Sequence, residues 1–183
     1  MPLGIAFKGP EGIVLAADSR VTLTREIQQA QGQSLILPAT FDNATKLLRV
    51  KGQQHVGAVT YGLGALGLQA PRTAHSFLPE FEAVIGCDRV TVAEFVERLS
   101  EFFVNQWQMH MQTIPPGQRI PDMIFLTGGY DRDAPYGRVF EVAVPSRPVP
   151  REWFPGAGDF GAVWGGQKEV VDRIIQGFDP RVL

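Results

Sequence analysis

The sequence predicts an α+β fold in which helices cover antiparallel sheets. Its 183 residues are enough for one domain with a sizeable core. Hydrophobic residues make up 44% and charged residues 20% of the chain, as in ordinary globular domains. Hairpin patterns stand before and after a pair of helical patterns, an order typical of layered α+β architectures. We therefore expect a single domain over residues 1–183.

The first half of the chain predicts two hairpins with a loop between them. Residues 3–8 and 13–17 are expected strands joined by turn residues at 9–12. The apolar run over 13–17 is unbroken, which indicates a strand buried on both faces. Residues 22–42 are polar, rich in glutamine and without a clear period, which indicates a long loop. The second hairpin pairs residues 45–50 with residues 55–61.

The second half predicts a helix pair, a third hairpin and a last helix. In the second helix Thr91 is an expected N-cap, and Glu94 three residues later completes a capping box. Apolar residues then follow at helical spacing. The expected helices span about residues 72–84, 91–111 and 162–176. The strands of the third hairpin span 123–127 and 138–144. A loop rich in proline is expected at 145–150 and a glycine-rich turn at 154–158.

Charge and composition exclude several classes of function. The net charge is −2, and lysine and arginine are scattered, which argues against nucleic acid or an acidic membrane surface as the main partner. No segment has the apolar length of a membrane span, and the first residues lack the pattern of a signal peptide. We expect a cytoplasmic protein. The single cysteine, Cys87, and three histidines show no metal-ligand spacing, so no metal or cofactor is expected.

Five segments carry a resemblance to a known family when they are taken in order. Residues 12–22 (GIVLAADSRVT), 45–48 (TKLL), 57–62 (GAVTYG), 125–131 (FLTGGYD) and 155–159 (PGAGD) are the segments. Each is weak alone, but their order and spacing resemble the β-type subunits of the proteasome core particle, in the N-terminal-nucleophile hydrolase superfamily. The resemblance covers nearly the whole chain.

The resemblance implies a four-layer αββα sandwich, assembly into a homo-oligomeric ring, and peptide-bond hydrolysis in an enclosed chamber. An ATPase or another proteasome-like subunit is an implied partner, and no cofactor is implied. The second helix agrees with assembly, because its apolar residues span more than a narrow stripe. We expect self-association through the helical layers, in which Phe95, Phe102 and Phe103 take part.

In this family an N-terminal threonine hydroxyl is the nucleophile and its own α-amine is the base. Carried over by position, Lys46 is the lysine that lowers nearby pKa values and Asp18 is the aspartate that holds it. Gly62 is the glycine whose backbone N–H stabilises the oxyanion. Taken singly, Asp18 could also cap a strand end and Lys46 could be a solvated edge-strand residue. The glycines at 62–67 lack the lysine of a phosphate-binding loop and favour a strand-to-helix turn.

The chain departs from the family pattern in four places, one of which is a longer loop between Thr22 and Lys46. Alignment on Gly4 puts the nucleophile one residue before Met1, and loss of Met1 would expose Pro2, which has no hydroxyl. Ala157 stands where the family usually has a serine. The family continues beyond the last helix with another helix and closing strands. The resemblance therefore predicts either a shortened subunit or a sequence that is part of a longer product.

Three functional hypotheses follow from these residues. The first is a ring-forming, proteasome-like subunit without threonine peptidase activity, acting as a scaffold or binding chamber in protein breakdown. The second is a threonine-type peptidase or amidohydrolase whose true N-terminus lies upstream, with peptides as substrates. The third is a non-catalytic subunit that supports an active partner.

Overall fold

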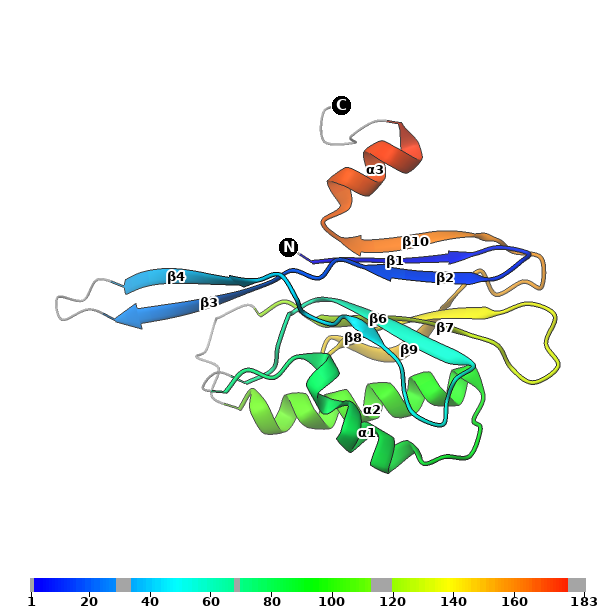
Figure 1. The fold of residues 1–183 in the computed structure, drawn as a ribbon, viewed down its shortest axis with the longest axis horizontal. Helices are drawn as coiled ribbons and strands as arrows, with labels where there is room; N and C mark the ends of the chain where they lie inside the picture. The colour runs from blue at the N-terminus through cyan, green and yellow to red at the C-terminus, as the bar shows by residue number, and fades with distance from the viewer. Residues whose placement is uncertain (1, 29–33, 68–69, 113–119, 178–183) are drawn as a thin grey trace.

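Two antiparallel sheets lie face to face in the middle of the molecule, with helices on both outer sides (Figure 1). The structure, a computed structural model, describes residues 2–28, 34–67, 70–112 and 120–177. In these residues the predicted α+β fold with antiparallel sheets is confirmed. No helix in this part of the chain is long and apolar enough to cross a membrane.

The three-stranded sheet has the strand order β10-β1-β2. Its strands are β1 (Leu3–Lys8), β2 (Ile13–Ala17) and β10 (Gly161–Gly166). The predicted first hairpin is confirmed, with Phe7 paired to Val14. The expectation that residues 13–17 are buried on both faces is wrong, because Val14 is 60% exposed. Alternate residues of this sheet point outward, and only the inner face packs on the second sheet.

The five-stranded sheet has the order β5-β6-β7-β8-β9, and its middle strands are almost fully buried. One face packs on the three-stranded sheet and the other on helices, which explains the continuous apolar runs of β6 to β8. Residues 145–150, expected as a loop, instead lead into an edge strand; Pro148 and Pro150 are tolerated there because an edge strand has one unpaired side. The strands are β5 (Leu47–Leu48), β6 (Val56–Gly62), β7 (Met123–Gly129), β8 (Arg138–Val144) and β9 (Arg147–Trp153).

Two helices and a 3-10 turn cover the outer face of the five-stranded sheet. They are η1 (Ala74–Phe77), α1 (Leu78–Ile85) and α2 (Val92–His110). The N-cap prediction is confirmed, since the Thr91 side chain accepts a hydrogen bond from the Glu94 N–H at 3.2 Å. The expected first helix, residues 72–84, is instead a 3-10 turn followed by α1, with Pro79 in the first turn of α1.

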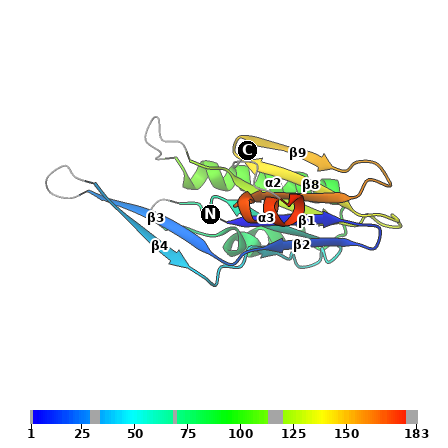
Figure 2. The ribbon, with the colours of Figure 1, turned by 90° about the horizontal axis from the view of Figure 1, so that it is seen from above.

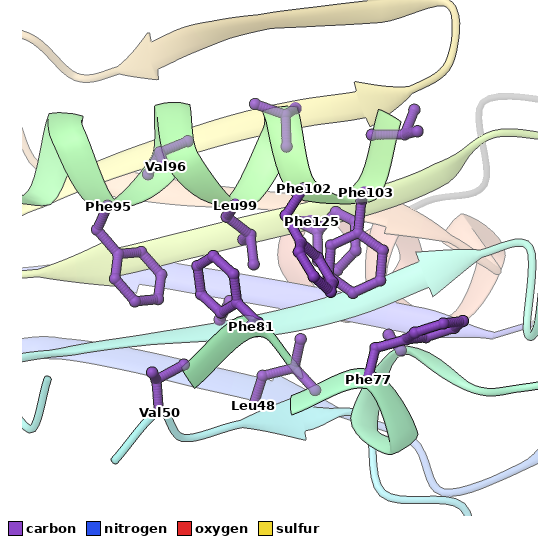
Figure 3. Packing of buried hydrophobic residues seen from close by; sticks show 14 of the residues in the cluster. Leu48, Val50, Phe77, Phe81, Phe95, Val96, Leu99, Phe102, Phe103 and Phe125 are labelled. Carbon is purple, nitrogen blue, oxygen red and sulfur yellow. The ribbon is translucent and has the colours of Figure 1, made fainter. Parts of the chain in front are cut away.

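The three phenylalanine side chains of α2 are buried inside the chain (Figure 3). Phe103 packs on Phe125 of β7 with ring centroids 4.6 Å apart and on Phe77 at 5.9 Å. Phe95 packs edge to face on Phe81 of α1. Phe102 also contacts Phe77 and Phe81. The expectation that this apolar stripe needs a second copy is therefore wrong, because η1 and α1 cover the side that faces away from the sheet.

Two paired strands occur within residues 22–42, where the sequence predicted a loop; residues 29–33 lie outside the described residues. Strands β3 (Val21–Gln28) and β4 (Ser34–Phe41) pair antiparallel, from Val21 with Phe41 to Gln28 with Ser34. The ribbon projects sideways from the two stacked sheets (Figures 1 and 2).

The expected last helix, residues 162–176, divides into a strand and a shorter helix. Residues 161–166 form β10, and α3 (Lys168–Gln176) lies on the outer side of the three-stranded sheet (Figure 1). Gly177 ends α3 in a left-handed conformation.

At the end of the three-stranded sheet away from α3, the buried Lys8 ammonium donates hydrogen bonds to two backbone carbonyls. They belong to Phe154, at 2.6 Å, and to Gly156. The glycine-rich turn is thus tied to the end of β1.

Candidate functional site

Asp18 and Lys46 meet at the beginning of the three-stranded sheet. The Lys46 Nζ lies 2.8 Å from Asp18 Oδ1 and also donates a hydrogen bond to the Arg20 carbonyl. The lysine side chain is 5% exposed and the aspartate side chain 31%. The prediction that the two charges lie within salt-bridge reach is confirmed. Because an unpaired buried ammonium is costly, Asp18 makes this position of Lys46 possible.

The Asp18 carboxylate binds two backbone N–H groups and the Lys46 side chain. Its Oδ1 accepts the Leu3 N–H at 2.6 Å as well as the lysine, and its Oδ2 accepts the Arg20 N–H at 3.0 Å. Partial burial opposes ionisation, but the hydrogen bonds from Leu3, Lys46 and Arg20 outweigh it and hold the pKa of Asp18 below its ordinary value. The carboxylate is therefore charged at neutral pH and fixes the first strand beside the lysine.

Hairpin geometry brings these residues together from distant places in the sequence. The pairing of β1 with β2 sets Gly4 opposite Ala17, so Asp18 lies beside the start of β1, and its N–H donates to the Leu3 carbonyl. Lys46 immediately precedes β5, and its carbonyl accepts the Thr60 N–H of β6 at 3.1 Å. The two charged residues thus come from the two facing sheets.

A small cavity opens beside the lysine. Its volume is about 10 Å³, which is room for about one water molecule. The Thr60 hydroxyl is buried there and has no hydrogen-bond partner in the part of the chain that the structure describes. A polar atom in the cavity could satisfy it. The lining residues are Pro2, Val21, Ala44, Thr45, Lys46, Thr60, Tyr61, Leu63, Gly64, Thr73 and Ala74.

Gly62 lies between two residues of the cavity wall but does not line the cavity itself. It ends β6 with a φ of +82°, a conformation that favours glycine. A Cβ at this position would lie 2.2 Å from the Asp122 carbonyl oxygen, which accepts the Leu63 N–H at 2.8 Å. The glycine therefore allows the chain to turn from the sheet into the cavity wall.

Pro2 lies in the same cavity wall as Lys46. Its carbonyl accepts the Gln167 N–H at 3.1 Å, and Leu3 is held by Asp18. Pro2, the first residue that the structure describes, therefore lies in the cavity beside the lysine. The nucleophile position that the alignment on Gly4 predicted, one residue before Met1, lies outside the described residues.

Sequence reasoning missed the turn formed by Gly166 and Gln167. A Cβ on Gly166 would lie 1.7 Å from the Pro2 carbonyl oxygen, so this glycine allows a close approach of the two backbones. The signal that could have found it is the Gly165-Gly166 pair immediately before a helix.

The turn at residues 155–159, which was matched to the family's active-site turn, lies elsewhere. Gly161 pairs with Lys8, whereas Gly166 pairs with Leu3. The two turns are therefore separated by the length of β10, about 17 Å at the rise of a β-strand. Ala157 is exposed at that distant end, and its assignment to the site is wrong.

Tyr61 is the other titratable residue of the cavity wall. Burial and the nearby Glu141 carboxylate raise the pKa of its hydroxyl above the ordinary value, although Arg147 opposes them. Arg147 also pairs with Glu141. The tyrosine is therefore neutral at physiological pH and does not serve as a base there.

The arrangement can stabilise negative charge and lower the pKa of a neighbouring amine or hydroxyl, because a buried ammonium favours the deprotonated form of such groups. No cluster of residues suited to a metal ion occurs in the described parts of the chain.

Comparison with known proteins assigns no family to this chain. No family model matches it, and no curated protein matches it.

Proposed function

We propose that this chain is a proteasome-like subunit of the N-terminal-nucleophile hydrolase superfamily. In this proposal the stacked sheets and their helices are a four-layer αββα sandwich, and the subunit forms rings in the cytoplasm that take part in protein breakdown. One observation carries the proposal: Asp18 binds both the buried Lys46 ammonium and the Leu3 N–H, and so holds the start of the chain at the lysine.

The proposed roles follow from these contacts. Lys46 lowers the pKa of a nucleophile attached to residue 2, and Asp18 compensates the buried charge. The Gly62 N–H stabilises an oxyanion formed beside them. In the 183-residue chain, position 2 is a proline, so the α-amine has no neighbouring hydroxyl or thiol. We therefore expect a chain that begins at Met1 to hydrolyse no peptide; in that form it would serve as a scaffold or binding chamber.

A gain-of-function variant tests the proposal. In Pro2→Thr, removal of Met1 leaves an N-terminal threonine at the cavity, which intact mass verifies. We expect this variant to hydrolyse fluorogenic peptides and to form a covalent adduct with a threonine-directed inhibitor. The matched control Pro2→Ala and the double variant Pro2→Thr with Lys46→Met should do neither. A folded Pro2→Thr chain with a verified N-terminal threonine that forms no adduct would contradict the proposed site.

The small cavity favours a second candidate function. At about 10 Å³ it admits about one water molecule and not a peptide side chain. A subunit of this kind would support an active partner rather than bind substrate itself. Purification of the native protein together with the proteins bound to it decides between a homo-oligomer and a mixed assembly. Its intact mass and N-terminal sequence decide whether a nucleophile lies upstream, as an active peptidase or amidohydrolase would require.

A further inference from the structure

An open groove of about 570 Å³ runs between helix α2 and the edge strand β9. Its volume is within the roughly 300–1,000 Å³ of pockets that bind ligands. One wall is a single face of α2, formed by Glu97, Ser100, Glu101 and Val104, and the other wall is the β9 segment 148–150. Strand β9 runs along one long side of the molecule, so the groove lies at its periphery (Figure 2).

The β9 wall of the groove is a bulge that is fixed to the helix. Residues 148–150 of β9 lie opposite the single residue Val142 of β8, so the segment bows away from the ladder. The buried Ser100 hydroxyl donates a hydrogen bond to the Pro148 carbonyl at 2.6 Å and ties the bulge to α2. Val149 is 74% exposed. Because its two neighbours are prolines without an N–H, the bulge offers too few donors for a partner to add a strand, and a partner contacts its side chains instead.

Two carboxylates of the groove have no cation beside them. Glu97 and Glu101 are exposed, stand one helical turn apart, and make no ion pair or hydrogen bond within the part of the chain that the structure describes. Like charges at this spacing repel each other. The arginines around the groove are engaged elsewhere: Arg98 and Arg147 pair with other glutamates, and Arg151 lies over a tryptophan ring. The groove therefore favours a partner that brings positive charge.

Positive charge of this kind lies at the opposite edge of the same sheet. Arg49 and Lys51 follow the edge strand β5, are exposed, and line a hollow of about 210 Å³. Their side chains make no ion pair among the described residues, and the Glu82 carboxylate in this hollow accepts the Lys51 N–H at 2.8 Å. Four strand spacings, about 19 Å, separate the two edges, so the unpaired charges do not meet within one chain.

We propose that the groove at the β9 edge of one copy of this chain binds the β5 edge of the next copy, head to tail. The two glutamates of the groove then meet Arg49 and Lys51, and the apolar bulge meets Leu47, which is 44% exposed on β5. The charges select which edges meet, and the apolar residues supply the buried area. The contact rests on the proposed function, of which the ring is a part, and it gives the ring its two surfaces.

Charge also decides between a head-to-tail contact and a two-fold contact. Two β9 grooves that faced each other would set carboxylates against carboxylates, and two β5 edges would set cations against cations. Like charges placed together across an interface cost free energy, so the unlike edges meet. Each copy then keeps one free edge of each kind, and the contact repeats until it closes into a ring.

Charge reversal on each edge tests the contact by size exclusion with light scattering at tens of micromolar protein and low salt. We expect the wild type to have a mass several times the 20.1 kDa of one chain. Glu97→Lys with Glu101→Lys makes both edges basic, and Arg49→Glu with Lys51→Glu makes both edges acidic. Each double variant alone should lose at least half of the wild-type mass, and so should Val149→Asp.

A mixture of the two double variants gives the sharpest readout. The basic chain and the acidic chain complement each other at both edges, so the mixture should assemble again with the two chains in equal amounts. A chain that carries all four reversals should assemble by itself. Glu11→Lys and Val84→Asp change exposed positions outside both surfaces and should leave the mass unchanged. Circular dichroism verifies that each variant is folded.

A monomeric wild type would overturn the contact. So would double variants that keep the wild-type mass, since the assembly then forms through other surfaces, and so would a mixture of folded variants that stays monomeric. The catalytic test separates the contact from the hydrolase site. If the reversals behave as expected while the Pro2→Thr chain forms no adduct, the contact stands and the proposed site does not. If the Pro2→Thr chain reacts while the wild type is a monomer, the site stands and the contact does not.

Discussion

Asp18 is the residue on which the candidate site depends most. It accepts hydrogen bonds from the start of β1, from the backbone after β2 and from the Lys46 ammonium. Asp18 and Lys46 could be identified from the sequence because each lies in a short motif beside a strand. Gly166 and Gln167 could not, since they contribute only backbone groups to the site. A residue that contributes only its backbone N–H or carbonyl to a site can have almost any side chain, so its role cannot be predicted from its residue type.

Replacement of Lys46 by methionine should destabilise the protein by about 2 kcal/mol, because it leaves a partly buried carboxylate without its cation. Urea unfolding of the two proteins measures this difference. As a control, Arg20→Ala removes the exposed ion pair of Arg20 with Asp42 and should cost much less than the lysine replacement, because solvent screens an exposed pair. Equal losses in the two variants would show that the buried pair contributes no more than a surface pair.

The Asp18 carboxylate should also make stability depend on pH. Its pKa in the folded protein lies below the ordinary value of about 3.9, so its contribution is present above about pH 4 and is lost as the pH falls through the folded pKa. In Asp18→Asn this contribution is absent at every pH. Urea unfolding at pH 6 and at pH 3 should show a stability difference between the two proteins that shrinks in acid. A difference that stays constant would argue against this assignment.

At the scale of elements, helix α2 and the hairpins that flank the helix pair agree with the sequence because their patterns are local. The Thr91 cap and the apolar spacing of α2 act within one helix. Strand β9 was missed because prolines argue against a strand, and only its place at a sheet edge removes the conflict. Strand β10 was missed because only Gln167 separates it from α3, so the sequence was interpreted as one helix over both elements. The ribbon of β3 and β4 was missed because its pairing becomes visible only when both strands are aligned.

The cap of α2 gives a prediction at this scale. Replacement of Thr91 by alanine should cost about 1 kcal/mol, since the Glu94 N–H loses its hydrogen-bond acceptor. The free energy of unfolding in urea measures the loss. Asn105→Ala, at an exposed position in the interior of the same helix, should be neutral or stabilising because alanine favours the helix.

At the scale of the whole molecule, the two apolar clusters lie on opposite faces of the five-stranded sheet. One cluster lies between this sheet and the helices α1 and α2, and the other lies between the two sheets. Strands β6 to β8 contribute to both clusters, because successive residues point to opposite faces. Loss of either cluster therefore removes support from the other.

We accordingly expect residues 1–183 to unfold in one cooperative transition. Phe103→Ala should lower stability by about 4 kcal/mol and still leave a single transition. Circular dichroism reports the helices, and tryptophan fluorescence reports Trp107 of α2, Trp153 of β9 and Trp164 of β10. Midpoints that separate by more than the experimental error would contradict a single domain.

The positions of the lysines have a consequence for chemical footprinting. The chain has four lysines, and Lys8 and Lys46 are buried near opposite ends of the three-stranded sheet, whereas Lys51 and Lys168 are exposed. An acylating reagent should modify the exposed pair at once and each buried amine only when its end of the sheet opens. The order in which Lys8 and Lys46 react would then show which end of the sheet separates first from its neighbours in the native protein.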